Sequence, residues 1–348
     1  MTRAVVFRCN VSATVGVGHL MRCREMARRL VAQGYGCAII GPPESLKRDG
    51  DDALFMHWEE VVVRGTSAED AGRVIAVCRR FDTNLLVMDD YRGDPEYQLL
   101  LKAAGIRWLQ QFDASKPWDF HGPLVVNSSP YERHAQYTQW LKHPHARTLF
   151  GPLYGVLRPA FCALEARGDG RPVHRILVGF GGGDDRGAID TVLGALAGKL
   201  GADVTLVVVS GSSNPRRDAI AARIAAMPEG QAEFHVDPAD MPGLMAGCDL
   251  AVIGGGTMSY EAAICGLPMV FIALAPNQER PCQGWHDLTG APVLGQVGQV
   301  AADAVYNAVT ELLQDDTRRR KMAAKGRALV DGKGADRLVD ALLEKETS

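Results

Sequence analysis

The sequence predicts an α/β protein made of two Rossmann-like, doubly wound domains in tandem. Short apolar runs alternate with longer helical patterns along most of the chain, which is typical of a parallel sheet covered by helices on both faces. The alternation stops once, at the polar and breaker-rich stretch 165–172, and then starts again. Because 348 residues are about twice a typical domain, we expect a first domain over residues 1–164 and a second over residues 173–348.

The elements expected in each domain follow from the period of their apolar residues. Runs of Val, Ile, Leu or Phe bounded by polar residues predict strands, and apolar residues three or four positions apart predict helices. The expected strands are 4–7, 37–40, 61–63, 85–88, 108–112, 124–126, 176–178, 204–209, 233–236, 250–253 and 269–273. The expected helices are 20–31, 69–80, 96–104, 188–199, 218–226, 258–265, 303–313, 317–330 and 335–344.

The composition excludes several classes of protein. The net charge of -3 gives no basic surplus for nucleic acid, and no apolar run approaches the roughly 20 residues of a membrane helix. The N-terminus lacks the apolar core of a signal peptide. The 8 cysteines show no CxxC spacing. We therefore expect reduced thiols, no zinc site and a cytoplasmic location.

Both predicted domains open with a strand, a glycine-rich loop and a helix. The loops are Gly16-Val17-Gly18-His19 and Gly181-Gly182-Gly183-Asp184. Open α/β sheets bind ligands beyond the carboxyl ends of their strands. Two such edges that face each other would form a cleft, and this is the arrangement we expect.

A nicotinamide or flavin dinucleotide site is disfavoured by two features. The third glycine of the GxGxxG pattern is missing after His19, and the next predicted strand ends at Ile40-Gly41-Pro42 without an acid for a ribose hydroxyl. The P-loop pattern GxxxxGKS or GxxxxGKT is also absent from the sequence.

The loop around His19 is the first candidate site. Gly16 and Gly18 let backbone N–H groups approach a phosphate at the start of a helix, and an imidazole at this point can act as a general base. The alternative is a histidine that only caps or packs at the helix start. Arg22, one turn later, is either a phosphate ligand or a solvated arginine.

The second candidate is the turn 254–257 with the helix that follows it. Gly255, Gly256 and Thr257 can donate to a diphosphate, and Glu261 can accept from ribose hydroxyls. The alternative is a tight turn with a capping threonine.

Polar residues at three other strand ends are weaker candidates. Gly182 and Gly183 belong to a further candidate loop and precede Asp184. The alternative to a functional role is that Asp184 caps the next helix. Asn277 and Gln278 follow the strand at 269–273 and can bind hydroxyls, amides or phosphate, with a helix cap at Asn277 as the alternative. Asp89, Asp90 and Tyr91 close the strand at 85–88, where catalytic or substrate-binding carboxylates often lie, and a simple strand-end turn is the alternative.

Together these motifs resemble the pseudaminic-acid-pathway UDP-sugar hydrolases, which cleave UDP-2,4-diacetamido-2,4,6-trideoxy-β-L-altropyranose. The resemblance covers nearly the whole chain. The matching stretches are Phe7-Arg8, Gly16-x-Gly18-His19-x-x-Arg22, Met88-Asp89-Asp90-Tyr91, Phe112-Asp113, Val126-Asn127, 151–154, 181–184, 212–215, 241–261, Asn277-Gln278, 318–329 and 331–335.

The resemblance implies a GT-B fold, related to the MurG-type glycosyltransferases, with UDP bound by the C-terminal domain. His19 corresponds to the histidine held to be catalytic in this family. The resemblance assigns the turn 254–257 to the diphosphate, Glu261 to the ribose, and Asn277 and Gln278 to the diphosphate or sugar.

Two residues depart from the family pattern. Members usually have an aspartate where this chain has Asn10, and an acid where it has Ala114. Exchange of a carboxylate for an amide removes a charge from the loop that presents His19, which puts the identity of the sugar in doubt.

We therefore expect a hydrolase that removes UDP from a diacetamido-trideoxy or related amino-deoxy sugar in nonulosonic acid or surface glycan biosynthesis. Water attacks the anomeric carbon directly, with His19 as the catalytic residue. The expected substrate-binding residues are Asn10, Gly16, Gly18, Arg22, Asp90, Tyr91, Gly182, Gly183, Gly255, Gly256, Thr257, Glu261, Asn277 and Gln278. We expect neither metal nor cofactor, and neither nucleic acid nor membrane as a partner. Two alternatives stay open: a GT-B glycosyltransferase with a UDP-sugar donor, and an inactive sugar-nucleotide-binding homologue.

Overall fold

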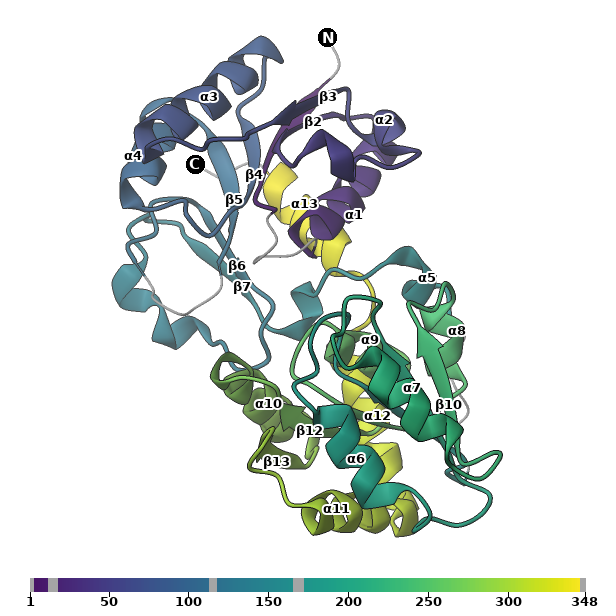
Figure 1. Cartoon of the computed structure of the whole chain (residues 1–348). Helices are drawn as coiled ribbons and strands as arrows, with labels where there is room; N and C mark the ends of the chain where they lie inside the picture. Colours follow the sequence, from purple (N-terminus) through teal and green to yellow (C-terminus); the bar gives the residue numbers. More distant parts are fainter. Residues whose placement is uncertain (1–2, 12–17, 113–117, 165–171, 345–348) are drawn as a thin grey trace. The chain divides into compact units, whose positions relative to one another are not determined.

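The computed structural model describes residues 3–11, 18–112, 118–164 and 172–344. The chain divides into two compact units. Unit 1 consists of Met1–Arg158 and Gly332–Ser348, and unit 2 of Pro159–Asp331. Each unit is built on one parallel sheet with helices between most successive strands (Figure 1). The predicted doubly wound α/β class is therefore confirmed.

Unit 1 contains a seven-stranded parallel sheet in the order β3-β2-β1-β4-β5-β6-β7. Its strands are β1 (Ala4–Cys9), β2 (Gly36–Gly41), β3 (His57–Glu60), β4 (Leu85–Asp89), β5 (Arg107–Gln111), β6 (Leu124–Asn127) and β7 (Arg147–Phe150). Its helices are α1 (Gly18–Ala32), α2 (Asp51–Leu54), α3 (Ser67–Arg80), α4 (Pro95–Ala103) and α13 (Gly334–Leu343). Local sequence explains where α3 and α4 begin: Thr66 and Glu69 form a capping box, and Asp94 caps α4 ahead of Pro95.

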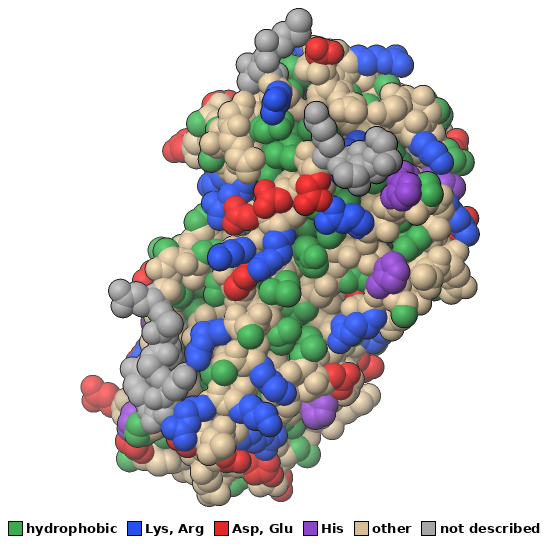
Figure 2. All heavy atoms as spheres, turned by 180° about the vertical axis from the view of Figure 1, so that it is seen from behind, with side chains coloured by type: hydrophobic (Ala, Val, Ile, Leu, Met, Phe, Trp, Pro, Cys, Tyr) green, Lys and Arg blue, Asp and Glu red, His purple; other side chains and the backbone are tan. Residues whose placement is uncertain are grey.

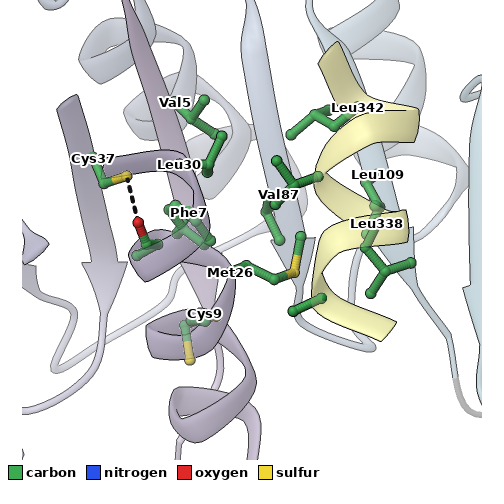
Figure 3. Packing of buried hydrophobic residues seen from close by; sticks show 14 of the residues in the cluster. Val5, Phe7, Cys9, Met26, Leu30, Cys37, Val87, Leu109, Leu338 and Leu342 are labelled. Carbon is green, nitrogen blue, oxygen red and sulfur yellow. Dashed lines mark hydrogen bonds between the residues drawn. The ribbon is translucent and has the colours of Figure 1, made fainter. Parts of the chain in front are cut away.

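The core of unit 1 depends on two helices from opposite ends of the chain. In α1, buried apolar residues recur every three or four positions, at Leu20, Cys23, Met26 and Leu30. They pack with strand residues and with Leu338 and Leu342 of α13 (Figure 3). Helix α13 (yellow) lies beside α1 in Figure 1, so the last helix completes the first core.

Helix α13 belongs to unit 1, whereas the domain boundaries expected from the sequence place it in the second domain. Those boundaries place residues 332–348 in the second domain, whereas contacts group them with unit 1. The physical reason is the apolar stripe of α13, whose residues Leu338, Val339 and Leu342 are fully buried in the unit 1 core. Sequence order alone does not reveal such a return of the chain.

Unit 2 contains a six-stranded parallel sheet in the order β10-β9-β8-β11-β12-β13. Its strands are β8 (Arg175–Gly179), β9 (Thr205–Ser210), β10 (Ala232–Val236), β11 (Leu250–Ile253), β12 (Met269–Ala273) and β13 (Val293–Gln296). Its helices are α5 (Pro159–Cys162), α6 (Ala188–Leu196), α7 (Arg217–Ala225), α8 (Met241–Ala246), α9 (Met258–Ile264), α10 (Pro276–Thr289), α11 (Ala302–Gln314) and α12 (Asp316–Leu329).

Several elements differ from the sequence-based expectation. The strand expected at 61–63 is wrong: β3 ends at Glu60, and Val62 and Val63 are 84% and 75% exposed. The β-branched residues 61–63 therefore lie beyond the part of this edge strand that pairs with β2. Strands β7 and β13 and helix α10 were not expected, because the two strands are short edge strands and α10 contains Pro281.

Three further observations concern the surface, the cysteines and the length of the helices. On the face in Figure 2, basic and acidic side chains are interspersed among small apolar clusters. Cys162 is exposed, and the other cysteines are buried. Among the described residues, no helix is both long and apolar enough to cross a membrane. The cytoplasmic location stays a prediction.

Candidate functional site

The start of α1, which carries His19, lies at the centre of the carboxyl edge of the unit 1 sheet. Strands β1 and β4 are neighbours there, and the chain leaves them toward opposite sides of the sheet. Cys9 at the end of β1 pairs with Asp89 at the end of β4. Such a switch point is where open α/β sheets form their ligand crevice. The topology therefore brings the start of α1 next to Asp89.

His19 is held at this point by Asp89. The imidazole lies in the first turn of α1, and the residue is 4% exposed. Its Nδ1 is 2.7 Å from Asp89 Oδ1. Because Asp89 is a carboxylate acceptor, Nδ1 carries the proton and donates it to Asp89, which leaves the lone pair on Nε2. The ring of Tyr91 packs edge-on against the imidazole, with ring centres 4.6 Å apart.

Arg22 shares the same carboxylate. Its Nε donates to Asp89 Oδ2 at 3.1 Å, and its Nη2 donates to Asp89 Oδ1 at 2.8 Å and to the Tyr91 hydroxyl at 3.3 Å. The guanidinium therefore supplies the counter-charge of Asp89 and fixes Tyr91. A direct contact of Arg22 with substrate stays a prediction.

Asp89 remains ionised in this buried place. Burial by itself raises the pKa of its carboxyl group, but the charge of Arg22 and the hydrogen bonds from His19 and Arg22 bring that pKa below its ordinary value. An ionised Asp89 accepts both donors at once. The carboxylate thus fixes the orientation of the imidazole.

A second ion network, in which Arg8, Asp70 and Asp90 are buried and Arg92 is exposed, lies beside the first. Arg8 donates from Nε and Nη2 to the two carboxylate oxygens of Asp70, at 2.9 and 3.1 Å, and lies 3.4 Å from Asp90. Arg92 donates to both oxygens of Asp90 at 2.8 and 2.6 Å. Burial acts to raise the pKa of Asp90, but Arg92 and Arg8 lower it below its usual value.

Asn10 belongs to this second network. Its Oδ1 accepts from Arg92 Nη2 at 3.1 Å, and its backbone N–H donates to the Asp89 carbonyl at 3.0 Å. The described partner of the Asn10 side chain is therefore Arg92 rather than His19. Gly18 begins α1 and has open space where a Cβ would stand. Gly16, Asp113 and Ala114 lie outside the described residues.

The glycine loops of unit 2 follow two neighbouring central strands, β8 and β11. Gly182 and Gly183 are exposed, have no left-handed backbone, and have no atom within 4 Å of an added Cβ. Nothing in the described protein therefore requires glycine at these two positions. Open space beside a backbone is what a closely approaching ligand needs.

The turn after β11 is built differently. A Cβ on Gly255 would crowd Cys282 and the backbone of Gln278, so internal packing explains this glycine. Gly256 and Thr257 are exposed. Thr257 has helical backbone angles and makes no side-chain cap bond, which removes the capping alternative. Glu261 is buried in the first turn of α9.

Helix α10 carries the two predicted amides. Its first residue is Pro276 and its cap position is Ala275, so Asn277 is not a helix cap; it is an exposed residue of the first turn. Gln278 Oε1 accepts from the Leu274 N–H at 3.1 Å. Gln278 therefore supports the end of β12, and its Nε2 faces Gly256 across the turn.

The sequence places Asp89 at a strand end where functional carboxylates are common, but it does not predict that Asp89 is the hydrogen-bond partner of His19. The buried pair of Asp185 and Asn214 in unit 2 was not predicted either. Among the described residues, no cluster of three or more His, Cys, Asp or Glu side chains could hold a metal ion.

Comparison with known proteins assigns the chain to a family. No family model matches it. The spore coat polysaccharide biosynthesis protein SpsG of Bacillus subtilis is 32% identical over an alignment of 338 residues, which covers 94% of this chain and 94% of SpsG. The chain belongs to the SpsG family. SpsG-family membership does not by itself test the expected membership in the pseudaminic-acid-pathway hydrolases.

Solved structures related to this SpsG-family chain confirm the GT-B fold. MurG of Acinetobacter baumannii superposes with a TM-score of 0.68 and 16% identity, covering 97% of this chain and 99% of MurG. HepE of Anabaena, in complex with UDP and glucose, superposes with a TM-score of 0.61 and 14% identity, covering 98% and 99% of the two chains. At such low identity the likeness shows the fold alone.

The lowered pKa values predict that unit 1 loses stability in acid. A carboxyl group whose folded pKa lies below its unfolded value stabilises the fold above the unfolded pKa, and this contribution is lost as the pH falls through the folded pKa. For Asp89 and Asp90 the loss begins near the unfolded value of about 3.9. We expect the free energy of unfolding to fall steeply below about pH 4.

Urea unfolding followed by tryptophan fluorescence measures this effect, since four of the 5 tryptophans, Trp58, Trp108, Trp118 and Trp140, lie in unit 1. The Asp90→Asn variant is the control: its stability is lower at neutral pH and depends less on pH in acid. An equal acid dependence of the variant and the parent protein would contradict the assignment.

Proposed function

We propose that this chain is a sugar-nucleotide-using enzyme of polysaccharide biosynthesis, and that it hydrolyses a UDP-activated amino-deoxy sugar. The observation that carries the proposal is the imidazole of His19 held by the buried Asp89 carboxylate at a sheet switch point. A histidine held in one tautomer, with Nε2 free of that bond, is suited to take a proton from a nucleophile.

Relatives support the nucleotide and the biological setting. SpsG of Bacillus subtilis is named for spore coat polysaccharide biosynthesis, and HepE of Anabaena is described in complex with UDP. The motifs that resemble the pseudaminic-acid-pathway hydrolases support the amino-deoxy sugar and water as the acceptor. UDP and its sugar are therefore the substrate parts assigned to this chain.

The reaction is a single displacement at the anomeric carbon. His19 Nε2 takes a proton from water as the water oxygen forms a bond to that carbon from the face opposite UDP. The bond between the anomeric carbon and the diphosphate oxygen breaks, and its electron pair leaves with UDP. The proton stays on His19 until it passes to solvent, and the anomeric configuration is inverted. Asp89 keeps the imidazole ring oriented while the ring gains and then loses a positive charge.

Unit 2 binds the nucleotide in this proposal. The exposed backbones of Gly182 and Gly183 donate to the diphosphate, and the Gly256 backbone and the Thr257 hydroxyl stabilise its leaving charge. Glu261 accepts from the ribose, and Asn277 bonds the diphosphate or the sugar. Gln278 acts through the turn that it supports.

A glycosyltransferase would use the same donor and the same base, with a sugar hydroxyl in place of water. Release of UDP in the absence of any acceptor separates the two reactions. The experiment incubates the protein with a panel of UDP-sugars and measures free UDP and free sugar together. Stoichiometric release of both supports hydrolysis, whereas release only after addition of a sugar acceptor supports transfer.

Replacement of His19 tests the base. We expect His19→Ala to lower turnover by about 10²- to 10⁴-fold, because a general base contributes about that much. The affinity for UDP, measured by calorimetry, stays unchanged because the nucleotide is bound by unit 2. His134→Ala, at an exposed histidine of the same unit, is the matched control and keeps full turnover. Normal turnover of His19→Ala would refute the role of His19.

The Gly183→Ala variant tests the role of the loop 181–184 in nucleotide binding without disturbing the fold. An added methyl group at Gly183 meets no protein atom within 4 Å, so thermal stability is expected to stay unchanged. The same methyl occupies space that the diphosphate needs, and we expect UDP affinity to fall by roughly 5- to 100-fold. Gly72→Ala is the control, because Gly72 in α3 also has open space beside it. Unchanged UDP affinity of Gly183→Ala would remove this loop from the site.

A further inference from the structure

The glycine loop after β8 is tied to the loop after β9. A Cβ on Gly211 would collide with the backbone of Gly182, so the two loops touch. Ser213 Oγ donates to the Gly182 carbonyl at 2.6 Å, and Arg216 pairs with Asp184. The conformation of residues 181–184 therefore depends on residues 211–216.

A buried amide–carboxylate pair lies beneath this contact. Asn214 Nδ2 donates to Asp185 Oδ1 at 3.0 Å and lies 2.9 Å from Ser210 Oγ. Asp185 is 1% exposed and Asn214 is 4% exposed. Neither side chain is open enough to contact a ligand, so any role in binding acts through the loops.

The pair connects both loops to the helices that follow them. Asp185 Oδ2 accepts from the Ile189 N–H at 2.9 Å, in the first turn of α6. Asn214 Oδ1 accepts from the Arg216 N–H at 3.0 Å, just before α7. Each side chain thus bonds its own helix start and its counterpart in the other loop. Loss of either one leaves a buried polar group without its partner.

We propose that Asp185 and Asn214 are positioning residues that hold the loop 181–184 in the shape that receives the nucleotide diphosphate. This inference rests on the proposed function, because it assumes that unit 2 binds UDP. Backbone donors bind an anion well only when they are already oriented, since ordering a free loop costs affinity. The pair orients the loop from its buried side, and leaves open space beside Gly182 and Gly183 for a ligand.

An exchange of the two side chains provides the test. In Asp185→Asn, two amides meet and one donor faces another donor. In Asn214→Asp, two carboxylates meet and repel each other.

The double variant, which carries both substitutions, restores the pattern with the roles exchanged. The new amide at position 185 accepts from the Ile189 N–H and donates to the new carboxylate at position 214, and that carboxylate accepts from the Arg216 N–H. The Ser210 hydroxyl then donates instead of accepting.

We expect each single variant to raise the Kd of UDP by about tenfold, which is typical of the loss of one buried hydrogen bond. The double variant is expected to return the Kd to within about threefold of the parent protein. In turnover assays the single variants raise KM and leave kcat nearly unchanged, because the base lies in unit 1. A purely structural role predicts that thermal stability falls in the single variants and recovers in the double variant, with no rise in the Kd of UDP and no split between KM and kcat.

Asp249→Asn is the matched control for Asp185→Asn. Asp249 also accepts backbone N–H groups, from His174 and Arg175, but at the opposite edge of the same sheet. It is expected to lower thermal stability and leave the Kd of UDP unchanged. If a single variant at 185 or 214 fails to fold, Ser213→Ala removes only the exposed bond to Gly182, and a weaker UDP affinity at unchanged stability is expected.

The outcomes separate this inference from the function on which it rests. Failure of the parent protein to bind UDP overturns the proposed function. UDP binding by the parent protein, together with unchanged Kd in the single variants, overturns the positioning role alone. Equal weakening by Asp249→Asn, or no recovery in the double variant, also overturns the positioning role.

Discussion

The buried carboxylate of Asp89 is the constraint on which the chemistry of unit 1 depends. It accepts from His19 and from Arg22 at the same time, so one ionised group orients the imidazole and neutralises the guanidinium. A buried charge without a partner would be strongly destabilising, and the buried charge of Asp89 has its partner in the half-buried Arg22. The neighbouring Arg8–Asp70 and Arg92–Asp90 pairs follow the same rule. The carboxyl edge of this sheet thus carries a set of paired charges, in which Asp89 orients His19.

Unit 2 uses the same topology with different chemistry. Its central loops offer backbone groups and small side chains, and its buried polar pair, Asp185 and Asn214, lies beneath a loop instead of at the surface. This division suits a reaction in which one part of the substrate must be activated and the other, an anion, must be held. Charged side chains fix a base, whereas backbone N–H groups bind phosphate oxygens without a competing proton transfer.

Local patterns in the sequence predict the sheets and His19, but not the long-range contacts. The apolar runs predict most of the central strands, and the loop Gly16-Val17-Gly18-His19 marks the candidate base. The contact between His19 and Asp89 joins residues 70 positions apart, so no spacing rule reveals it. The packing of α13 into the first core has the same cause. Short edge strands such as β7 carry too few apolar residues to be predicted, and Pro281 hides α10.

The most direct test of the role of Asp89 is a comparison of kcat for the parent protein and Asp89→Asn at one pH, with UDP affinity measured in parallel. The amide keeps the shape of the side chain but no longer requires the proton on Nδ1, so His19 can present the wrong nitrogen. We expect kcat to fall by about 10²- to 10⁴-fold, with the Kd of UDP unchanged. A kcat equal to that of the parent protein would show that Asp89 does not govern the chemistry of His19.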